Sequence, residues 1–413
     1  GLSVEDIDGD GAVRTMRIAD PDGAWVEHAE DVRVMVPVGP LGVAPGTQRY
    51  RLLDEGVLEN FDGFTIPMPR DPAGLDLNRN FPAGWGTTVL GSGDHPMSEP
   101  EIDSLVRAAR SRTNVCGYNA FHTAGGFMLR PSSTRPDSTL PPFDIWVYNE
   151  LGKVGVQHTG YPVHSVYEDL TWDKSDTMSG AGDDWAYEHL GVFGWTTEFW
   201  DIIFHATGKH SPTDVWYVGP TPEQELAVCK WTDTHAPGSY SPWKKFNHPQ
   251  LGEIEIGGCD PIKTWSNAPA SKLRDEVAPH VHFAIYQALA SPRLEIKRAN
   301  AEALGNGVYK VEIGIANTGW LGTEISEWAH KNKIVLPLTA EISGATLVEG
   351  APRVKLGQLD GRVKFRVSGD AKSDGTPDRV LQSWLIRGEK GQRVTLTATH
   401  QRAGVASAVV ELP

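Results

Sequence analysis

Apolar residues between about positions 100 and 290 follow two different periods. Residues 102–109, 143–157 and 271–290 carry apolar side chains at helical spacing, and residues 115–122 and 192–199 are apolar runs of strand length. Strands that alternate with helices in this way favour a mixed α/β sheet covered by helices on both faces.

The pattern changes beyond Pro292, where the helical period disappears. Short strands separated by turn residues are expected at 294–297, 308–316, 334–342, 362–367, 380–386, 394–400 and 406–412. Such a series is typical of an all-β sandwich of immunoglobulin type. We therefore expect two domains, an α/β domain over residues 1–290 and an accessory β-sandwich over residues 291–413.

Residues 20–71 are rich in Pro, Gly and Asp and contain only short strand-like pieces, such as residues 32–38. This composition predicts long surface loops, which often frame a cleft in a compact enzyme.

Charge and composition exclude several classes of protein. The net charge of -15 leaves no extended basic face, which argues against a nucleic-acid partner. No apolar run is long enough to cross a bilayer. The three cysteines are too few and too scattered for a disulfide framework or a cysteine zinc site.

The first residues contain half of a calcium-loop pattern. Asp6, Asp8 and Asp10 alternate and are followed by Gly11, as in the first half of an EF-hand loop. The twelfth position, which should be a bidentate glutamate, is Arg17. A complete EF-hand is therefore excluded, and two interpretations remain: a partial calcium site or an acidic turn between strands.

Three short stretches carry candidate chemistry. Asn78 and Arg79 can together grip one carboxylate, although the dipeptide alone favours a structural salt bridge from Arg79 to Asp76 or to an acidic loop. His122 ends an apolar strand and is either a packed core histidine or a metal ligand. Glu198 stands among aromatic residues, where an unpaired carboxylate is costly, and this favours a functional role.

Taken together, these stretches resemble the zinc metallocarboxypeptidases of the carboxypeptidase A and B family. The resemblance rests on GLDLNRNF at 74–81, SEPE at 98–101, FHTAG at 121–125, GDDWAY at 182–187 and TTEF at 196–199. SEPE also has the form of a helix capping box. Each motif is weak alone, but their order and spacing follow the family, and the expected fold is a metallocarboxypeptidase-like domain that lacks its N-terminal part.

The resemblance implies a role for each candidate residue. His122 would be the third zinc ligand, Asn78 and Arg79 would hold the terminal carboxylate of the substrate, and Glu198 would be the general base. Asp183 falls at the floor of the pocket for the C-terminal side chain, so it would favour Lys or Arg there; capping of the following turn is the alternative.

A second arginine normally steadies the oxyanion in this family. Arg17 is the best candidate for that role, with Arg14 behind it, and a surface charge is the alternative for both.

The chain departs from the family in its metal ligands. The family takes two of them from an H-x-x-E motif upstream of the arginine clamp, and none of the 14 histidines has Glu three residues later. One histidine cannot hold a catalytic zinc, which needs three protein ligands. Either the chain is the downstream part of a longer or cleaved protein, with a separate N-terminal fragment supplying the ligands, or the metal has been lost.

The favoured hypothesis is a zinc-dependent exopeptidase that removes residues from the C-terminus of a peptide or protein. Two alternatives are an amidase acting on cell-wall peptides and a non-catalytic pseudo-peptidase that binds carboxylates or peptides. The family is often exported, which favours a secreted or periplasmic location.

Overall fold

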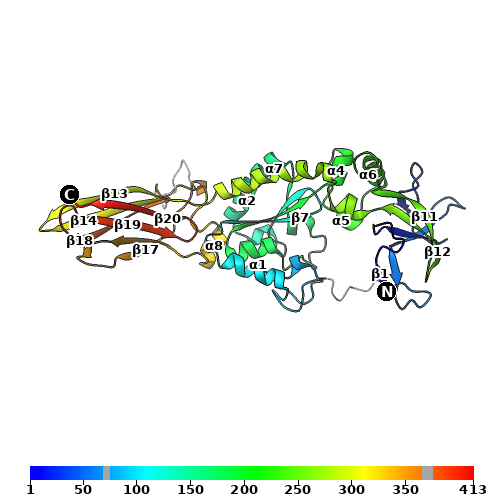
Figure 1. Ribbon diagram of the computed structural model, residues 1–413, viewed down its shortest axis with the longest axis horizontal. Coiled ribbons are helices and arrows are strands. Elements are labelled where there is room, and N and C mark those ends of the chain that lie inside the picture. Colours follow the sequence, from blue (N-terminus) through cyan, green and yellow to red (C-terminus); the bar gives the residue numbers. More distant parts are fainter. Residues whose placement is uncertain (68–74, 365–374) are drawn as a thin grey trace. The chain divides into compact units, whose positions relative to one another are not determined.

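The structure, a computed structural model, describes residues 1–67, 75–364 and 375–413, without the side chain of Trp216 (Figure 1). The chain divides into two compact units, each assembled from separate segments. The first unit comprises Gly1–Gly74, Phe121–Phe127 and Thr197–Pro279, and the second comprises Leu75–Ala120, Met128–Thr196 and His280–Pro413.

An antiparallel sheet in the first unit replaces the loops that we expected over residues 20–71. Its six strands run in the order β11-β12-β2-β5-β3-β4, and a separate strand pair joins β1 and β6. The strands are β1 (Leu2–Val4), β2 (Thr15–Ala19), β3 (Trp25–Glu27), β4 (Met35–Pro37), β5 (Tyr50–Asp54), β6 (Gly56–Leu58), β11 (Tyr240–His248) and β12 (Gly252–Cys259). The loop prediction is wrong for β3, β5 and β6, because strands of three to five residues are too short to show alternation. Strand β4 falls inside the strand-like piece expected at residues 32–38. The last residues of the expected loops, 68–71, lie outside the described residues.

One face of this sheet is closed by an apolar core. Met16, Ile254 and Ile256 are almost fully buried there and pack with Leu2 and Leu58 of the strand pair. The helices of the unit have a second core around Trp200, Ile203 and Val228. They are α4 (Ile202–Thr207), α5 (Val215–Val218), α6 (Pro222–His235), the π-helical turn η5 (Ile262–Ser266) and α7 (Ala270–Leu289), whose last residues belong to the second unit.

The α/β pattern that we expected is confirmed in coarse form. A four-stranded sheet has the order β7-β10-β8-β9, with β8 and β9 parallel. Its strands are β7 (Gly117–Thr123), β8 (Phe127–Arg130), β9 (Val163–Ser165) and β10 (Phe193–Phe199). The accompanying helices and turns are η1 (Leu77–Arg79), α1 (Pro100–Arg110), η2 (Asp137–Thr139), α2 (Pro142–Thr159), η3 (Val166–Leu170), α3 (Gly182–Trp185) and η4 (Ala186–Leu190).

Helix α2 lies close to this sheet because two of its positions lack side chains. A Cβ atom on Gly155 would lie 2.8 Å from Cε of Met128, at the flexible end of that side chain. A Cβ atom on Gly152 would lie 3.1 Å from Cγ2 of Val163, so a larger residue at either position would require a neighbouring side chain to shift. Val147, Tyr148 and Leu151 are buried along the same helix.

Among the described residues, no helix is both long and apolar enough to cross a membrane.

The expected capping box at residues 98–101 is wrong. Glu99, not Ser98, is the N-cap of α1, and it makes no side-chain capping hydrogen bond. The Ser98 hydroxyl instead donates to Glu99 Oε1 (2.7 Å) and accepts from Asn80 Nδ2 (2.9 Å). The serine therefore ties the helix start to the η1 segment.

The last part of the second unit, which we call the C-terminal β region (residues 293–413), contains two four-stranded antiparallel sheets. Their orders are β13-β14-β18-β16 and β17-β15-β19-β20. The elements are β13 (Leu294–Gly305), β14 (Val308–Asn317), α8 (Glu327–Asn332), β15 (Leu338–Ser343), β16 (Thr346–Leu347), β17 (Arg353–Gly357), η6 (Arg362–Lys364), β18 (Arg379–Arg387), β19 (Arg393–His400) and β20 (Gly404–Glu411).

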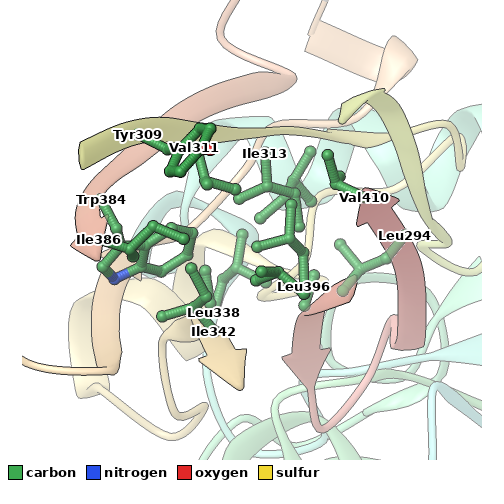
Figure 2. Packing of buried hydrophobic residues seen from close by; sticks show 14 of the residues in the cluster. Leu294, Tyr309, Val311, Ile313, Leu338, Ile342, Trp384, Ile386, Leu396 and Val410 are labelled. Atoms are coloured by element: carbon green, nitrogen blue, oxygen red, sulfur yellow. The ribbon is translucent and has the colours of Figure 1, made fainter. Parts of the chain in front are cut away.

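Both sheets contribute to one apolar core. Figure 2 shows Val311 and Ile313 of β14 pointing toward Leu338 of β15 and Leu396 of β19, and all four are fully buried. Along β19, buried residues alternate with exposed or half-buried ones, so one face of this strand lies in the core.

One of the strands expected in this region is not formed over its described residues. Residues 362–364 form a short 3-10 helix and not a strand, and residues 365–367 of the expected strand lie outside the described residues. The immunoglobulin-type connectivity and the division at residue 290 stay predictions.

Candidate functional site

Asn78 and Arg79 lie on η1, the short turn that begins at Leu77. Asp76 caps this turn, since its Oδ1 accepts the backbone N–H of Asn78 (2.9 Å). Asn78 Oδ1 accepts the N–H of Gly182 (2.9 Å), and Arg79 Nη1 donates to the Asn78 carbonyl (2.9 Å). Arg79 Nη1 lies 3.5 Å from Asp76 Oδ2, which is long for an ion pair, and the Asp76 carboxylate is half exposed. This ion pair is therefore weak.

The segment before Asp183 packs directly against this turn. Phe81 donates its N–H to the Gly180 carbonyl (3.0 Å). A Cβ atom on Gly180 would lie 2.1 Å from the Arg79 carbonyl oxygen, and the residue has a φ of +76°, so only glycine fits. This close approach brings residues 180–183 beside Asn78 and Arg79.

Asp183 stands in this environment as a buried carboxyl group that is not fully satisfied. Its side chain is 2% exposed, and within the described residues its Oδ2 accepts no hydrogen bond. Burial raises the pKa of Asp183 to about 6, while the nearby Arg79 guanidinium acts in the opposite direction. A buried carboxylate with an unused oxygen is stabilised by a cation placed beside it.

Asp184, the next residue, uses its carboxylate differently. Both of its oxygens accept the N–H of Ser133, at 3.1 and 2.9 Å. Burial and the neighbouring Asp183 both raise its pKa. Of the two adjacent aspartates, Asp184 is therefore engaged by the protein and Asp183 retains a free oxygen.

The Asp183 charge acts on two tyrosines, Tyr118 and Tyr148, that the sequence did not single out. Burial, followed by the Asp183 charge, raises the pKa of Tyr118 to about 12. Tyr148 is fully buried, and its hydroxyl accepts the N–H of Gly194 (3.2 Å). A tyrosine inside the apolar face of a predicted helix, such as Tyr148, is a signal that a polar partner lies nearby.

His122 and Glu198 lie on the neighbouring strands β7 and β10, at the ends that belong to the first unit. The Gly126 N–H donates to the Glu198 carbonyl (2.8 Å), which ties the turn after His122 to β10. The rings of Phe121 and Phe199 are 5.3 Å apart and so share one face of the sheet. Because side chains alternate along a strand, His122 and Glu198 share the opposite face. Both are half-buried.

The residues around His122 do not by themselves fit a catalytic zinc. Across the described residues, the one group of three or more His, Cys, Asp or Glu side chains able to hold a metal is Asp6, Asp8 and Glu55. His122 belongs to no such group, and a catalytic zinc needs three protein ligands.

That acidic group differs from the calcium loop expected at Asp6, Asp8 and Asp10. Asp10 pairs with Arg14 (2.9 Å), and the fully buried Glu55 takes its place in the group. Glu55 accepts the N–H groups of Ile7 (2.8 Å) and Arg14 (2.8 Å). These bonds give the cluster a structural explanation, and calcium is unsupported.

Arg17 is engaged inside the six-stranded sheet. Its Nε donates to Glu255 (2.7 Å), its Nη1 donates to Glu27 (2.8 Å), and its guanidinium stacks on Tyr50 at 4.3 Å. Arg14 similarly donates to the carbonyls of Gly238, Ser239 and Gly258. These contacts explain both arginines as structural, and the oxyanion role stays a prediction.

The structure thus brings the candidates together in two groups. Asn78, Arg79 and Asp183 meet in the second unit, and His122 and Glu198 share a sheet face in the first unit. Arg17 joins neither group within the contacts described here.

Comparison with known proteins identifies the central segment. A family model described as zinc carboxypeptidase matches residues 54–213, and a model described as a domain of unknown function matches residues 293–411. No curated protein matches the chain. The resemblance to the zinc carboxypeptidase family is therefore confirmed for residues 54–213, which contain Asn78, Arg79, His122, Asp183 and Glu198.

Solved structures with similarity include thrombin-activatable fibrinolysis inhibitor, at 22% identity over 44% of this chain and 45% of that chain, with a TM-score of 0.26. The bovine form of that protein, in complex with tick carboxypeptidase inhibitor, gives 23% identity, 44% and 62% coverage, and a TM-score of 0.26. Carboxypeptidase A from Helicoverpa armigera gives 21%, 38% and 41%, and 0.25. The match spans less than two thirds of each of these chains.

Proposed function

We propose that this chain carries the substrate-recognition residues of a carboxypeptidase-type hydrolase that acts at the C-terminus of a peptide and prefers Lys or Arg there. The premise is the match of residues 54–213 to the zinc carboxypeptidase family, which supports a metallocarboxypeptidase-like function. The observation that carries the preference is the buried Asp183 carboxyl, whose Oδ2 accepts no hydrogen bond within the described residues.

The grip on the terminal carboxylate is assigned to Asn78 and Arg79. Arg79 is half-buried, and its contact with Asp76 is long at 3.5 Å, so its guanidinium can turn to a carboxylate that presents two oxygens. Asn78 is held in place by the Gly182 N–H, which keeps the side chain beside the Asp183 segment.

Glu198 and His122 are assigned the chemical roles. Glu198 is the candidate general base, because a half-buried carboxylate beside a reacting group can hold and pass a proton. Zinc is expected for the family, and His122 would be one of its ligands. The described residues supply only this one candidate, so an active site of the family's type would need two further ligands.

Binding tests the recognition step without a metal. We expect acetyl-Ala-Arg to bind roughly tenfold more tightly than acetyl-Ala-Leu, because only the arginine side chain can form a charge-assisted hydrogen bond with Asp183. Asp183→Asn should remove this preference, and the amide form, acetyl-Ala-Arg-amide, should bind weakly because Arg79 has no carboxylate to hold. Isothermal titration calorimetry measures the affinity of each peptide for the parent protein and for Asp183→Asn. Equal affinity for the Arg and Leu peptides would show that Asp183 does not read the side chain.

A second candidate is a non-catalytic peptide-binding protein. The observation that favours it is that His122 belongs to no group of three metal-ligating side chains among the described residues. Release of free arginine from acetyl-Ala-Arg in the presence of zinc, abolished by Glu198→Ala, supports the hydrolase. Binding of the same peptide without any release under these conditions supports the non-catalytic protein.

A further inference from the structure

A cleft in the first unit lies between the six-stranded sheet and the helices α5 and α6. Its volume is about 480 Å³, which is within the range of ordinary ligand sites. The lining comes from the sheet strands and the turn at Arg33 on one side, and from the α5–α6 segment on the other. It includes Trp25, Met35, Glu225, Tyr240 and Trp243.

The walls of the cleft are mainly apolar and are braced from within the sheet. Trp25, Met35 and Trp243 contribute the largest apolar side chains. Arg17 stacks against Trp243 at 4.5 Å and reaches the Met35 sulfur at 3.7 Å, while two carboxylates fix its guanidinium. The cleft wall is therefore held by a neutralised arginine, which gives it a defined shape before any ligand arrives.

Glu225 is the acidic group of this lining. Its Oε1 accepts the hydroxyl of Tyr240, and within the described residues no hydrogen bond reaches its Oε2. Burial raises the pKa of Glu225, and the tyrosine hydroxyl opposes that effect. A carboxylate in an apolar cleft with one oxygen still available is a specific acceptor for one donor.

The charges around the cleft favour a cation. Arg33 is bound by both Asp31 and Asp233, at 2.7 Å each. Arg17 is bound by both Glu27 and Glu255. Each guanidinium is thus matched by two carboxylates, and Glu225 adds a further negative charge to the lining. A positively charged group gains from this field and an anion is repelled.

We propose that this cleft binds the lysine side chain of a peptide, with the methylenes along the apolar wall and the ammonium on Glu225 Oε2. A lysine stem covers apolar surface while its charged end stays polar, which matches this combination of tryptophans and one carboxylate. Arginine fits less well, because its fork pairs best with two carboxylate oxygens and Tyr240 occupies one of them. The proposal does not depend on the carboxypeptidase function, since Glu225, Trp25 and Trp243 lie outside residues 54–213.

The test uses N-acetyl-lysine methylamide, with the arginine and norleucine analogues as controls. All measurements are made in the full chain carrying Asp183→Asn, so that the buried aspartate of the second unit does not contribute. We expect the lysine probe to bind roughly tenfold more tightly than the norleucine analogue, because only its ammonium can form a charge-assisted hydrogen bond with Glu225. The affinity of the arginine analogue should lie between the two. Ligand-observed NMR titration measures each affinity.

Glu225→Gln should abolish the preference for lysine over norleucine. The matched control is Glu223→Gln, an exposed glutamate on the same helix, which should leave the preference intact. Equal binding of lysine and norleucine, or an unchanged preference in Glu225→Gln, overturns the proposal. If Glu225→Gln fails to fold, Trp25→Ala replaces it: this half-buried wall residue should weaken the lysine probe severalfold, and an unchanged affinity overturns the proposal equally.

Discussion

Two buried aspartates of the same compact unit are used in opposite ways. Asp144 on α2 is fully buried, and it accepts the Tyr187 hydroxyl (2.7 Å) and the N–H groups of Glu327 (2.8 Å) and Trp328 (2.9 Å). Asp183 is as deeply buried, but its Oδ2 accepts nothing within the described residues. Burial raises the pKa of both carboxyls; three donors oppose it at Asp144, and the backbone N–H groups of Asp183 and Asp184 and the Arg79 guanidinium oppose it at Asp183.

Asp144 has a structural role, whereas Asp183 is the residue that we propose binds a ligand. At Asp144 the donors come from the first turn of α8, so the carboxylate joins the C-terminal β region to α2. At Asp183 one carboxylate oxygen accepts no hydrogen bond within the described residues, and we propose that a positively charged ligand pairs with it. The same contrast holds for two arginines: Arg17 is bound by two carboxylates, whereas Arg79 has one loose ion pair.

The largest effect on stability is expected from Asp144→Ala. Removing the carboxylate leaves the donors of Tyr187, Glu327 and Trp328 without their acceptor, which should lower the free energy of unfolding by about 3–5 kcal/mol. Urea unfolding followed by circular dichroism measures this loss. Glu101→Ala, at an exposed position on α1, is the control and should stay within about 0.5 kcal/mol of the parent. A loss below about 1 kcal/mol in Asp144→Ala would remove the contrast with Asp183.

Arg17→Ala should give the next largest loss. The substitution leaves Glu27 and Glu255 facing each other without their shared cation and removes the packing against Tyr50, so we expect a loss of about 2–4 kcal/mol. Arg51→Ala is the matched control on β5, because the Arg51–Asp20 pair is exposed and should contribute less than about 1 kcal/mol. Thermal unfolding compares the two variants, and equal losses would contradict a structural role for Arg17.

The sequence predicted several long elements, but only residues 294–297 of β13, and it missed β11 and most of the short strands. Helices such as α2 and strands such as β14 are long enough for their apolar period to stand out. The strands β3 and β6 have three residues each, and their pairing with β5 and β1 elsewhere in the chain decides their structure. Composition rich in Pro and Gly therefore predicted loops where a sheet exists.

Residues of the candidate site could be grouped from the sequence only where a family motif linked segments that are far apart in the chain. Asn78 and Asp183 are far apart in sequence, and the hydrogen bond from Gly182 that joins their segments has no local signal. The family resemblance supplied that link. Arg17 shows the limit: its pattern indicates only a basic residue in a strand, and the partners Glu27 and Glu255 become visible only in the folded sheet.

The smallest effect has the opposite sign and depends on pH. The pKa of Asp183 is raised from 3.8 to about 6 in the folded protein, so between about pH 4 and pH 6 the native state holds a proton that the unfolded chain has released. Stability therefore falls as the pH rises through that window, by about 2 kcal/mol in total.

Asp183→Asn carries no charge in either state and should escape this loss. We expect it to match the parent near pH 4 and to be about 1–2 kcal/mol more stable at pH 7, because the buried negative charge is gone and Asp184 no longer has a charged neighbour. Urea unfolding at the two pH values measures the difference, with Asp103→Asn on the surface of α1 as the control. A variant that is less stable than the parent at pH 7 would mean that the Asp183 carboxylate is already compensated inside the protein, like that of Asp144, and has nothing left to offer a ligand.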